Sequence, residues 1–207
     1  MTRVEGRIIP KDMPKDMNET QQKSADLLKA LYAEAVRAAL PAAILPAHLP
    51  PRPQGRLVII AIGKAAASMA AAAEAHYGST GLEGIALTRH GHACPTRRIE
   101  VIEAGHPMPD AAGVAASTRI MELAATLSAD DLALVLISGG GSALATLPIE
   151  GVSLADKQAL TRALLASGAP IHDINTVRKH LSRIKGGRLA KAIAPARLLT
   201  LAISDVA

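Results

Sequence analysis

Two runs of six consecutive aliphatic residues place the strongest constraint on the fold of this chain. They are 57–62 (LVIIAI) and 132–137 (LALVLI), and glycine follows each within two residues. A strand that is apolar at every position is buried on both faces, as in parallel sheets that helices cover on both sides. Six residues are also far fewer than the roughly 18 that cross a bilayer. The runs therefore predict buried strands of a parallel sheet, and we expect no membrane partner.

The remaining periodic segments alternate between strand and helix patterns. Short apolar segments predict further strands, and amphipathic segments, one of them preceded by Asp110 as an N-cap, predict helices. Strands that alternate with helices imply βαβ units and a mostly parallel sheet. The strands are expected over 84–88, 99–104 and 198–203, and the helices over 21–40, 65–76, 111–127, 154–167, 171–182 and 186–193.

Composition narrows the class of protein. Hydrophobic residues make up 49% of the 207 residues, which excludes a disordered chain, and the only aromatic residues are Tyr32 and Tyr77. The core must then consist of Ala, Leu, Ile and Val. The polar residues 1–20 lack the apolar centre of a signal peptide and predict a disordered leader. The proline-rich stretch 41–56 predicts a stiff linker, and the single Cys94 favours a reducing, cytoplasmic location.

The positive charge of the chain is concentrated in one segment. The formal net charge is +5, but six of the basic residues lie between Arg178 and Lys191 with no acid among them. Without those six, acids would outnumber bases by one. The chain therefore lacks the broad basic surface and the aromatic platform of a nucleic-acid-binding protein. The pattern favours one compact anion as the partner.

A glycine-rich loop directly after the second aliphatic run is the strongest candidate site. Glycines let the backbone turn and present N–H groups to an oxyanion, and serines add hydroxyl donors. We expect a following helix to point its positive end at the same place. The alternative is a tight turn without a ligand. A dinucleotide fingerprint fails at Leu144, and a Walker A loop fails at Val58. The candidate residues are Ser138, Gly139, Gly140, Gly141 and Ser142.

Basic residues elsewhere in the chain could bind the same anion as this loop. Lys64 follows the first aliphatic run at a predicted helix start, where a cation is unfavourable unless an anion offsets it. A predicted helix places Asn175, Arg178 and Lys179 on one face. Lys185 and Arg188 flank the Gly-Gly break after that helix. A solvated basic face is the alternative, although such faces normally interleave acids.

Three further motifs are less specific. Asp205, after the last predicted strand, could hold Mg²⁺ or accept a hydroxyl proton, and it could equally cap a helix. His90, His92 and Cys94 alternate along the chain but fall short of the four ligands of a structural zinc site. His106, in a rigid turn that leads into a helix, could face the site or could have a structural role.

Taken together, these motifs resemble the amino-terminal part of the type II glycerate kinases, the MOFRL family. Many members of that family carry the name hydroxypyruvate reductase of the tartrate operon. The resemblance covers roughly residues 21–206. The matching segments are AIGKAA (61–66), EAGHPMPDAAG (103–113), LISGGGSAL (136–144), NTVRKHLSRIKGGRLA (175–190) and ISDV (203–206).

The resemblance implies a Rossmann-like α/β/α three-layer sandwich, a smaller second (MOFRL) domain, and an active site between the two domains. The implied reaction is phosphorylation of D-glycerate to 2-phosphoglycerate with ATP and Mg²⁺. Lys64 matches the family's active-site lysine, and the 138–142 loop and 175–188 segment match its phosphate and substrate contacts. The sequence stops at Ala207 before the second domain, so we expect 21–207 to be an incomplete N-terminal domain.

Two other functions remain open from the sequence. One is an NAD(P)H-dependent hydroxypyruvate reductase, which Leu144 and the missing acidic partner of a dinucleotide fingerprint disfavour. The other is a fragment that binds ligand without catalysis. The sequence also leaves open whether the protein forms a homodimer.

Overall fold

A computed structural model describes residues 18–203 of the chain, and the structure divides into two units at the Leu40–Pro41 bond. The first unit contains helix α1 (Glu19–Ala39), which the sequence predicted over 21–40. Asn18 caps this helix by accepting a hydrogen bond from the Gln21 N–H, and no residue of the helix is buried. The predicted leader 1–20 overlaps the start of this helix, and residues 1–17 lie outside the described part.

The second unit is built on a five-stranded sheet in which every neighbouring pair of strands is parallel. The strand order is β3-β2-β1-β4-β5, which confirms the predicted α/β class with a parallel sheet. Every predicted strand is present. The strands are β1 (Leu57–Ile62), β2 (Leu82–Arg89), β3 (Ile99–Ala104), β4 (Leu132–Ile137) and β5 (Arg197–Ala202).

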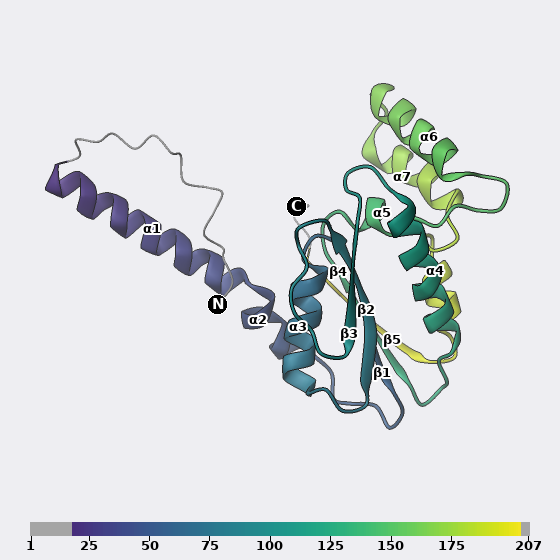
Figure 1. The fold of residues 1–207 in the computed structure, drawn as a ribbon, viewed down its shortest axis with the longest axis horizontal. Helices are drawn as coiled ribbons and strands as arrows, with labels where there is room; N and C mark the ends of the chain where they lie inside the picture. The colour runs from purple at the N-terminus through teal and green to yellow at the C-terminus, as the bar shows by residue number, and fades with distance from the viewer. Residues whose placement is uncertain (1–17, 204–207) are drawn as a thin grey trace. The chain divides into compact units, whose positions relative to one another are not determined.

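Helices cover both faces of the sheet (Figure 1). Helix α3 (Ala66–Tyr77) packs on one face, and α4 (Ala111–Ala125) and α8 (Arg188–Ile193) pack on the other. Successive β1 residues alternate between the two cores, with Ile59 facing α3 and Ile60 facing α4. Four alanines of α3 are fully buried, and their small side chains let the helix approach the sheet closely. They are Ala66, Ala67, Ala70 and Ala73.

The prediction of a stiff linker over 41–56 is wrong for its first half. Helix α2 (Pro41–Ile44) and the 3₁₀ helix η1 (Leu45–His48) occupy it, and both Pro41 and Leu45 are buried. Proline is compatible with the first turn of a helix, where its missing N–H costs nothing.

Within residues 18–203 no single helix meets the length and apolarity of a membrane span; only Glu19–Ala39 and Pro41–His48, taken together across their break, do so.

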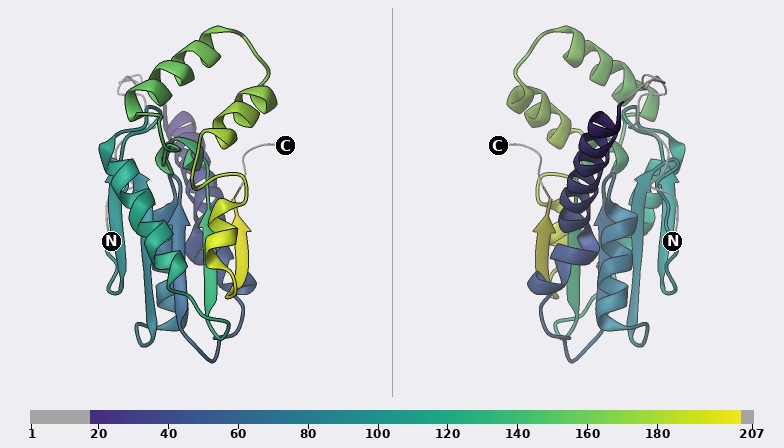
Figure 2. Two further views of the ribbon diagram at one scale, coloured as in Figure 1. Left: turned by 90° about the vertical axis from the view of Figure 1, so that its right-hand side faces the viewer. Right: turned by 90° about the vertical axis from the view of Figure 1, so that its left-hand side faces the viewer.

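The chain reverses its direction across the sheet between β1 and β4. From β1 it crosses over α3 to β2 on one side, and from β4 it continues to β5 on the other. In open parallel sheets such a switch point leaves a crevice beyond the carboxyl ends of the strands, where ligands bind. Helices α6 (Leu154–Ala166) and α7 (Ile171–His180) lie beyond these strand ends (Figure 2).

Candidate anion-binding site

Hydrogen bonds tie together the chain segments that leave β1 and β4. The Lys64 backbone N–H donates to the Gly139 carbonyl at 2.8 Å, and the Ala65 N–H donates to the Ser138 hydroxyl at 3.0 Å. Gly63 has a φ of 134°, and a Cβ there would lie 2.2 Å from the Ser138 oxygen. Glycine is therefore required at position 63, since both the backbone conformation and the close approach exclude a side chain.

The glycine-rich loop turns sharply at Gly140, which has a φ of 87° and is the one residue of the loop with a left-handed backbone. The helix expected after the loop is a single turn, α5 (Gly141–Leu144), so it contributes only a small dipole. The backbone N–H groups of Gly139, Gly140 and Ser142 donate no hydrogen bond to any residue within 18–203. These N–H groups are available to an oxyanion.

A hollow of about 430 Å³ opens beside this loop. Its walls combine backbone of the loop with aliphatic side chains and with the half-buried Lys185. Lys185 Nζ donates to the Ala145 carbonyl at the end of α5. Burial, followed by the charges of Lys157 and Arg178, lowers the pKa of Lys185 to about 7. The lining residues are Ile62, Ile137, Ser138, Gly140, Gly141, Ser142, Ala145, Ile184, Lys185 and Leu189.

Lys157, Arg178 and Lys185 form a cluster of cations without an acid. None of the three makes a salt bridge with another described residue. Lys157 is only 6% exposed and donates to the Leu181 carbonyl at 3.2 Å. Burial, followed by the Arg178 charge, lowers the pKa of Lys157, and burial lowers the pKa of Arg178. Buried like charges are unfavourable alone, so this cluster favours a bound anion.

On its other side the loop contacts Lys64 and His106. A Cβ on Gly140 would lie 2.8 Å from His106 Nε2 and 3.2 Å from Lys64 Cγ. Burial lowers the pKa of His106, and the charges of Lys64 and Arg89 lower it further. The sequence left the orientation of His106 open, and the structure places it against the loop. The sequence predicted Lys64 at the start of a helix. In the structure Lys64 lies two residues before the first residue of α3, just outside the helix.

The other predicted residues lie apart from the hollow. Asn175 and Lys179 are exposed on α7, and neither lines the hollow. The Arg188 guanidinium donates to the carbonyls of Lys179 and Lys185, so it holds the turn before α8. Asp205, the predicted Mg²⁺ ligand and proton acceptor, lies outside the described residues.

Lys157 is the residue of the cluster that the sequence analysis missed. It lies inside the predicted helix 154–167 and looks like an ordinary surface lysine in the sequence. The one local signal is its spacing from Thr161, which is also buried one turn later.

Within residues 18–203 no group of three or more His, Cys, Asp or Glu side chains could hold a metal ion, and this includes His90, His92 and Cys94.

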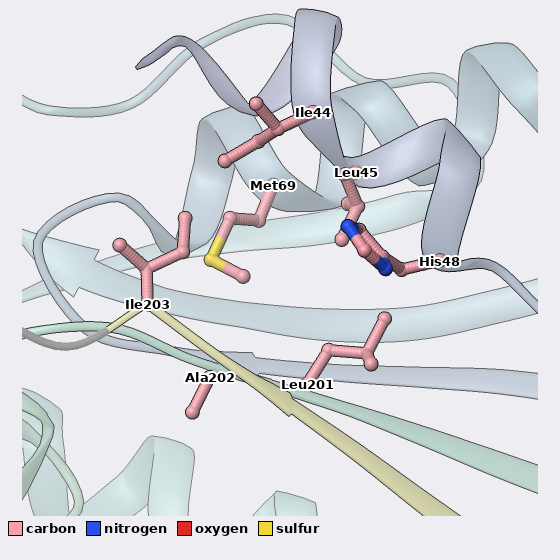
Figure 3. Close-up of a pocket in the computed structure, with 7 residues that line it drawn as sticks. All are labelled: Ile44, Leu45, His48, Met69, Leu201, Ala202 and Ile203. Atoms are coloured by element: carbon pink, nitrogen blue, oxygen red, sulfur yellow. The ribbon is translucent and has the colours of Figure 1, made fainter.

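A second hollow of about 270 Å³ lies beside α2, η1 and β5 (Figure 3). Its walls are aliphatic or thioether side chains with His48 as the single titratable group. It offers no set of polar groups that converge on a ligand, so it is not a candidate for catalysis. The lining residues are Ile44, Leu45, His48, Met69, Leu201, Ala202 and Ile203.

Within residues 18–203, a parallel sheet whose switch point carries a glycine loop with free N–H groups, flanked by cations without salt bridges, defines an α/β protein with a candidate oxyanion-binding site. Comparison with known proteins agrees with the α/β fold and gives the family. Residues 27–207 match the family described as "Domain of unknown function (DUF4147)". The chain belongs to this family, and its relatives include proteins named glycerate kinase and putative hydroxypyruvate reductase.

Curated relatives carry two different names. A "Putative hydroxypyruvate reductase" of Agrobacterium vitis is 50% identical over 180 residues, covering 87% of this chain and 41% of the relative. A "D-glycerate 2-kinase" of Thermotoga maritima is 45% identical over 177 residues, covering 85% of this chain and 42% of the relative. The chain thus spans about two fifths of the length of these relatives.

The fold has a solved counterpart. The crystal structure of a glycerate kinase (EC 2.7.1.31) from Thermotoga maritima superposes with a TM-score of 0.79 at 41% sequence identity. The match covers 89% of this chain and 45% of that chain.

Proposed function

We propose that this chain supplies the phosphate- and substrate-binding part of a glycerate 2-kinase, which phosphorylates D-glycerate to 2-phosphoglycerate with ATP. The glycine loop carries the proposal: Ser138–Ser142 presents free backbone N–H groups between Lys64 on one side and Lys185 on the other. The name of one relative, D-glycerate 2-kinase, and the EC number of the solved glycerate kinase support a kinase. Cytoplasmic location and a homodimer stay predictions.

The arrangement suits phosphoryl transfer because that reaction depends mainly on positioning and on neutralising negative charge. The loop N–H groups and the cations Lys64 and Lys185 would hold phosphate oxygens as charge develops on them. The 2-hydroxyl oxygen of glycerate forms the new bond to the γ-phosphorus while the bond to the ADP oxygen breaks. Asp205 is the proposed acceptor of the hydroxyl proton.

Mg²⁺ is part of this proposal, and Asp205 is its proposed protein ligand. The described residues around the loop offer cations and backbone donors, not a group of carboxylates. Direct contacts of Asn175 and Lys179 with the substrates are proposed from the family resemblance alone. Arg188 instead stabilises the turn before α8 through its hydrogen bonds to two backbone carbonyls.

The name hydroxypyruvate reductase on a relative that is 50% identical favours one alternative, hydride transfer from NAD(P)H. Leu144 stands where a dinucleotide fingerprint requires its third small residue, and it is fully buried. This loop therefore fits phosphate better than it fits a dinucleotide. A second alternative is that the chain binds these ligands without turnover, since it spans only part of its relatives.

The test measures 2-phosphoglycerate by ³¹P NMR after incubation of the chain with D-glycerate, Mg²⁺ and ATP, and calorimetry measures the binding of each substrate. We expect binding of both. Lys64→Ala should weaken ATP binding or turnover at least tenfold while the melting temperature changes little, because Lys64 is exposed. Lys191→Ala, another exposed lysine, is the matched control. Oxidation of NADH with hydroxypyruvate and no kinase turnover would support the reductase instead.

A further inference from the structure

Arg89 is a cation near the site that the proposed function does not use. It is the last residue of β2 and pairs in register with Ala104 of β3. Alternation along the strand puts it on the same face as Leu87, which faces α4. Its Nε atom is buried and has no hydrogen-bond partner within residues 18–203. A buried guanidinium N–H without a partner is costly unless a ligand accepts its hydrogen bond.

The surroundings of Arg89 are cationic. After burial, the charges of Lys64 and Arg89 lower the pKa of His106, whose imidazole lies against Gly140 of the loop. Arg89 forms no salt bridge with another described residue.

The carboxylates of the neighbouring segments have other partners. Glu103 on β3 accepts the backbone N–H groups of His92 and Ala93. Asp110 caps α4 through the Gly113 N–H, and one of its oxygens lies 3.4 Å from His90 Nε2. Arg89 is thus an unneutralised cation that points to a negative group supplied from outside the described chain.

We propose that Arg89 and His106 form an oxyanion subsite on the β2–β3 side of the loop, separate from the phosphate contacts proposed for Lys64, and that this subsite takes the carboxylate of the hydroxy acid. The assignment rests on the proposed kinase function. The planar guanidinium of Arg89 matches a carboxylate in a two-point hydrogen bond. The opposite side of the loop carries three cations, Lys157, Arg178 and Lys185, and it suits the more highly charged phosphates of the nucleotide.

The test compares two ligands on one pair of variants by calorimetry. D-glycerate and ATP are titrated separately, without the other substrate, into the unmodified chain and into Arg89→Gln. We expect Arg89→Gln to weaken glycerate binding about 10- to 100-fold, as for loss of a charge-assisted hydrogen bond, and ATP binding less than threefold.

The matched control is Arg98→Gln. Arg98 is an exposed arginine directly before β3, at the opposite end of the strand from the site. The same loss of charge there should change neither affinity. If Arg98→Gln weakens glycerate binding as much as Arg89→Gln does, the effect is one of overall charge and the subsite is wrong.

Two further measurements separate loss of the subsite from loss of the fold. Arg89→Lys keeps the charge and loses the planar fork, so we expect glycerate binding about 3- to 10-fold weaker with an unchanged melting temperature. In the unmodified chain, the His106 ring signal in NMR should shift with glycerate, and its pKa should rise because a negative charge arrives beside it.

The outcomes distinguish this inference from the function on which it rests. Glycerate and ATP binding by the unmodified chain, with no selective loss of glycerate in Arg89→Gln and no response of His106 to glycerate, would overturn the subsite alone. Failure of the unmodified chain to bind either ligand would overturn the proposed function and the subsite together. Equal weakening of both ligands in Arg89→Gln would also refute the assignment of the carboxylate to this side.

Discussion

Replacing Lys185 by methionine should stabilise the unliganded protein while it removes anion binding. Methionine keeps the length and the apolar stem of the side chain but removes the charge. In the folded chain the pKa of Lys185 is about 7, because of burial first and then the charges of Lys157 and Arg178. The ordinary lysine value is 10.5. The protein therefore carries a charged group at a place where the charged form is disfavoured.

The size of the effect follows from the two pKa values. At roughly 1.4 kcal/mol for each pH unit between them, the charged lysine costs the fold about 5 kcal/mol below pH 7. Lys185→Met also removes the hydrogen bond to the Ala145 carbonyl, and an unpaired buried acceptor costs about 1–3 kcal/mol. We expect a net gain of about 2–4 kcal/mol in the free energy of unfolding at pH 6.

The pH dependence of the stability difference tests whether the Lys185 charge causes it. Between about pH 7 and 10.5 the unfolded chain binds more protons at Lys185 than the folded chain does, so the stability of the unmodified protein rises with pH there. The advantage of Lys185→Met should then shrink by about 3 kcal/mol between pH 6 and pH 9. Urea unfolding at several pH values measures this, with the exposed Lys191→Met as the control.

A difference between Lys185→Met and the unmodified protein that stays constant over this pH range would refute the reasoning. So would a variant that is less stable than the unmodified protein at pH 6. Phosphate affinity, measured by calorimetry at pH 6, should fall at least tenfold in Lys185→Met. Retained affinity would show that the Lys185 charge is not part of the anion site.

Two further substitutions test the supports of the site and of the sheet. Gly63→Ala should cost about 3 kcal/mol of stability and lose phosphate affinity, because its Cβ would lie 2.2 Å from a serine hydroxyl. The control is Gly78→Ala, at a φ of 72° with nothing within 4 Å, which should cost about 1 kcal/mol in urea unfolding. Hydrogen bonds from the Ser128 N–H and from Arg56 lower the pKa of Asp131 to about 2. Asp131→Asn should therefore lose about 2 kcal/mol at pH 7, and this deficit should vanish as the pH falls from 4 to 2, which equal losses at both pH values would contradict.

Local sequence pattern was sufficient for most of the secondary structure. The runs 57–62 and 132–137 became β1 and β4 with the predicted bounds, because strands that are apolar at every position must be covered on both faces. Asp110 caps α4 as expected, since an N-cap depends only on residues within one turn. Helix ends differ from the predictions by one or two residues.

Predictions that depended on distant contacts were less complete. The proline-rich stretch 41–56 looked like a linker because prolines disfavour regular structure, yet burial of Pro41 and Leu45 gave it two short helices. The helix expected after the glycine loop is one turn long. Sequence alone could not decide whether His106 faces the loop, because that depends on how the β3–α4 turn lies over β4.

The sequence by itself determined that this protein is a parallel α/β fold with a glycine loop and basic residues at the ends of its strands. Those properties are encoded in periodicity and in short motifs, which act over a few residues. Only the tertiary structure decided which polar residues share the site: it buried Lys157 beside Lys185 and left Asn175 and Lys179 exposed. Charge density at a site depends on distances between segments far apart in the chain, and folding alone sets those distances.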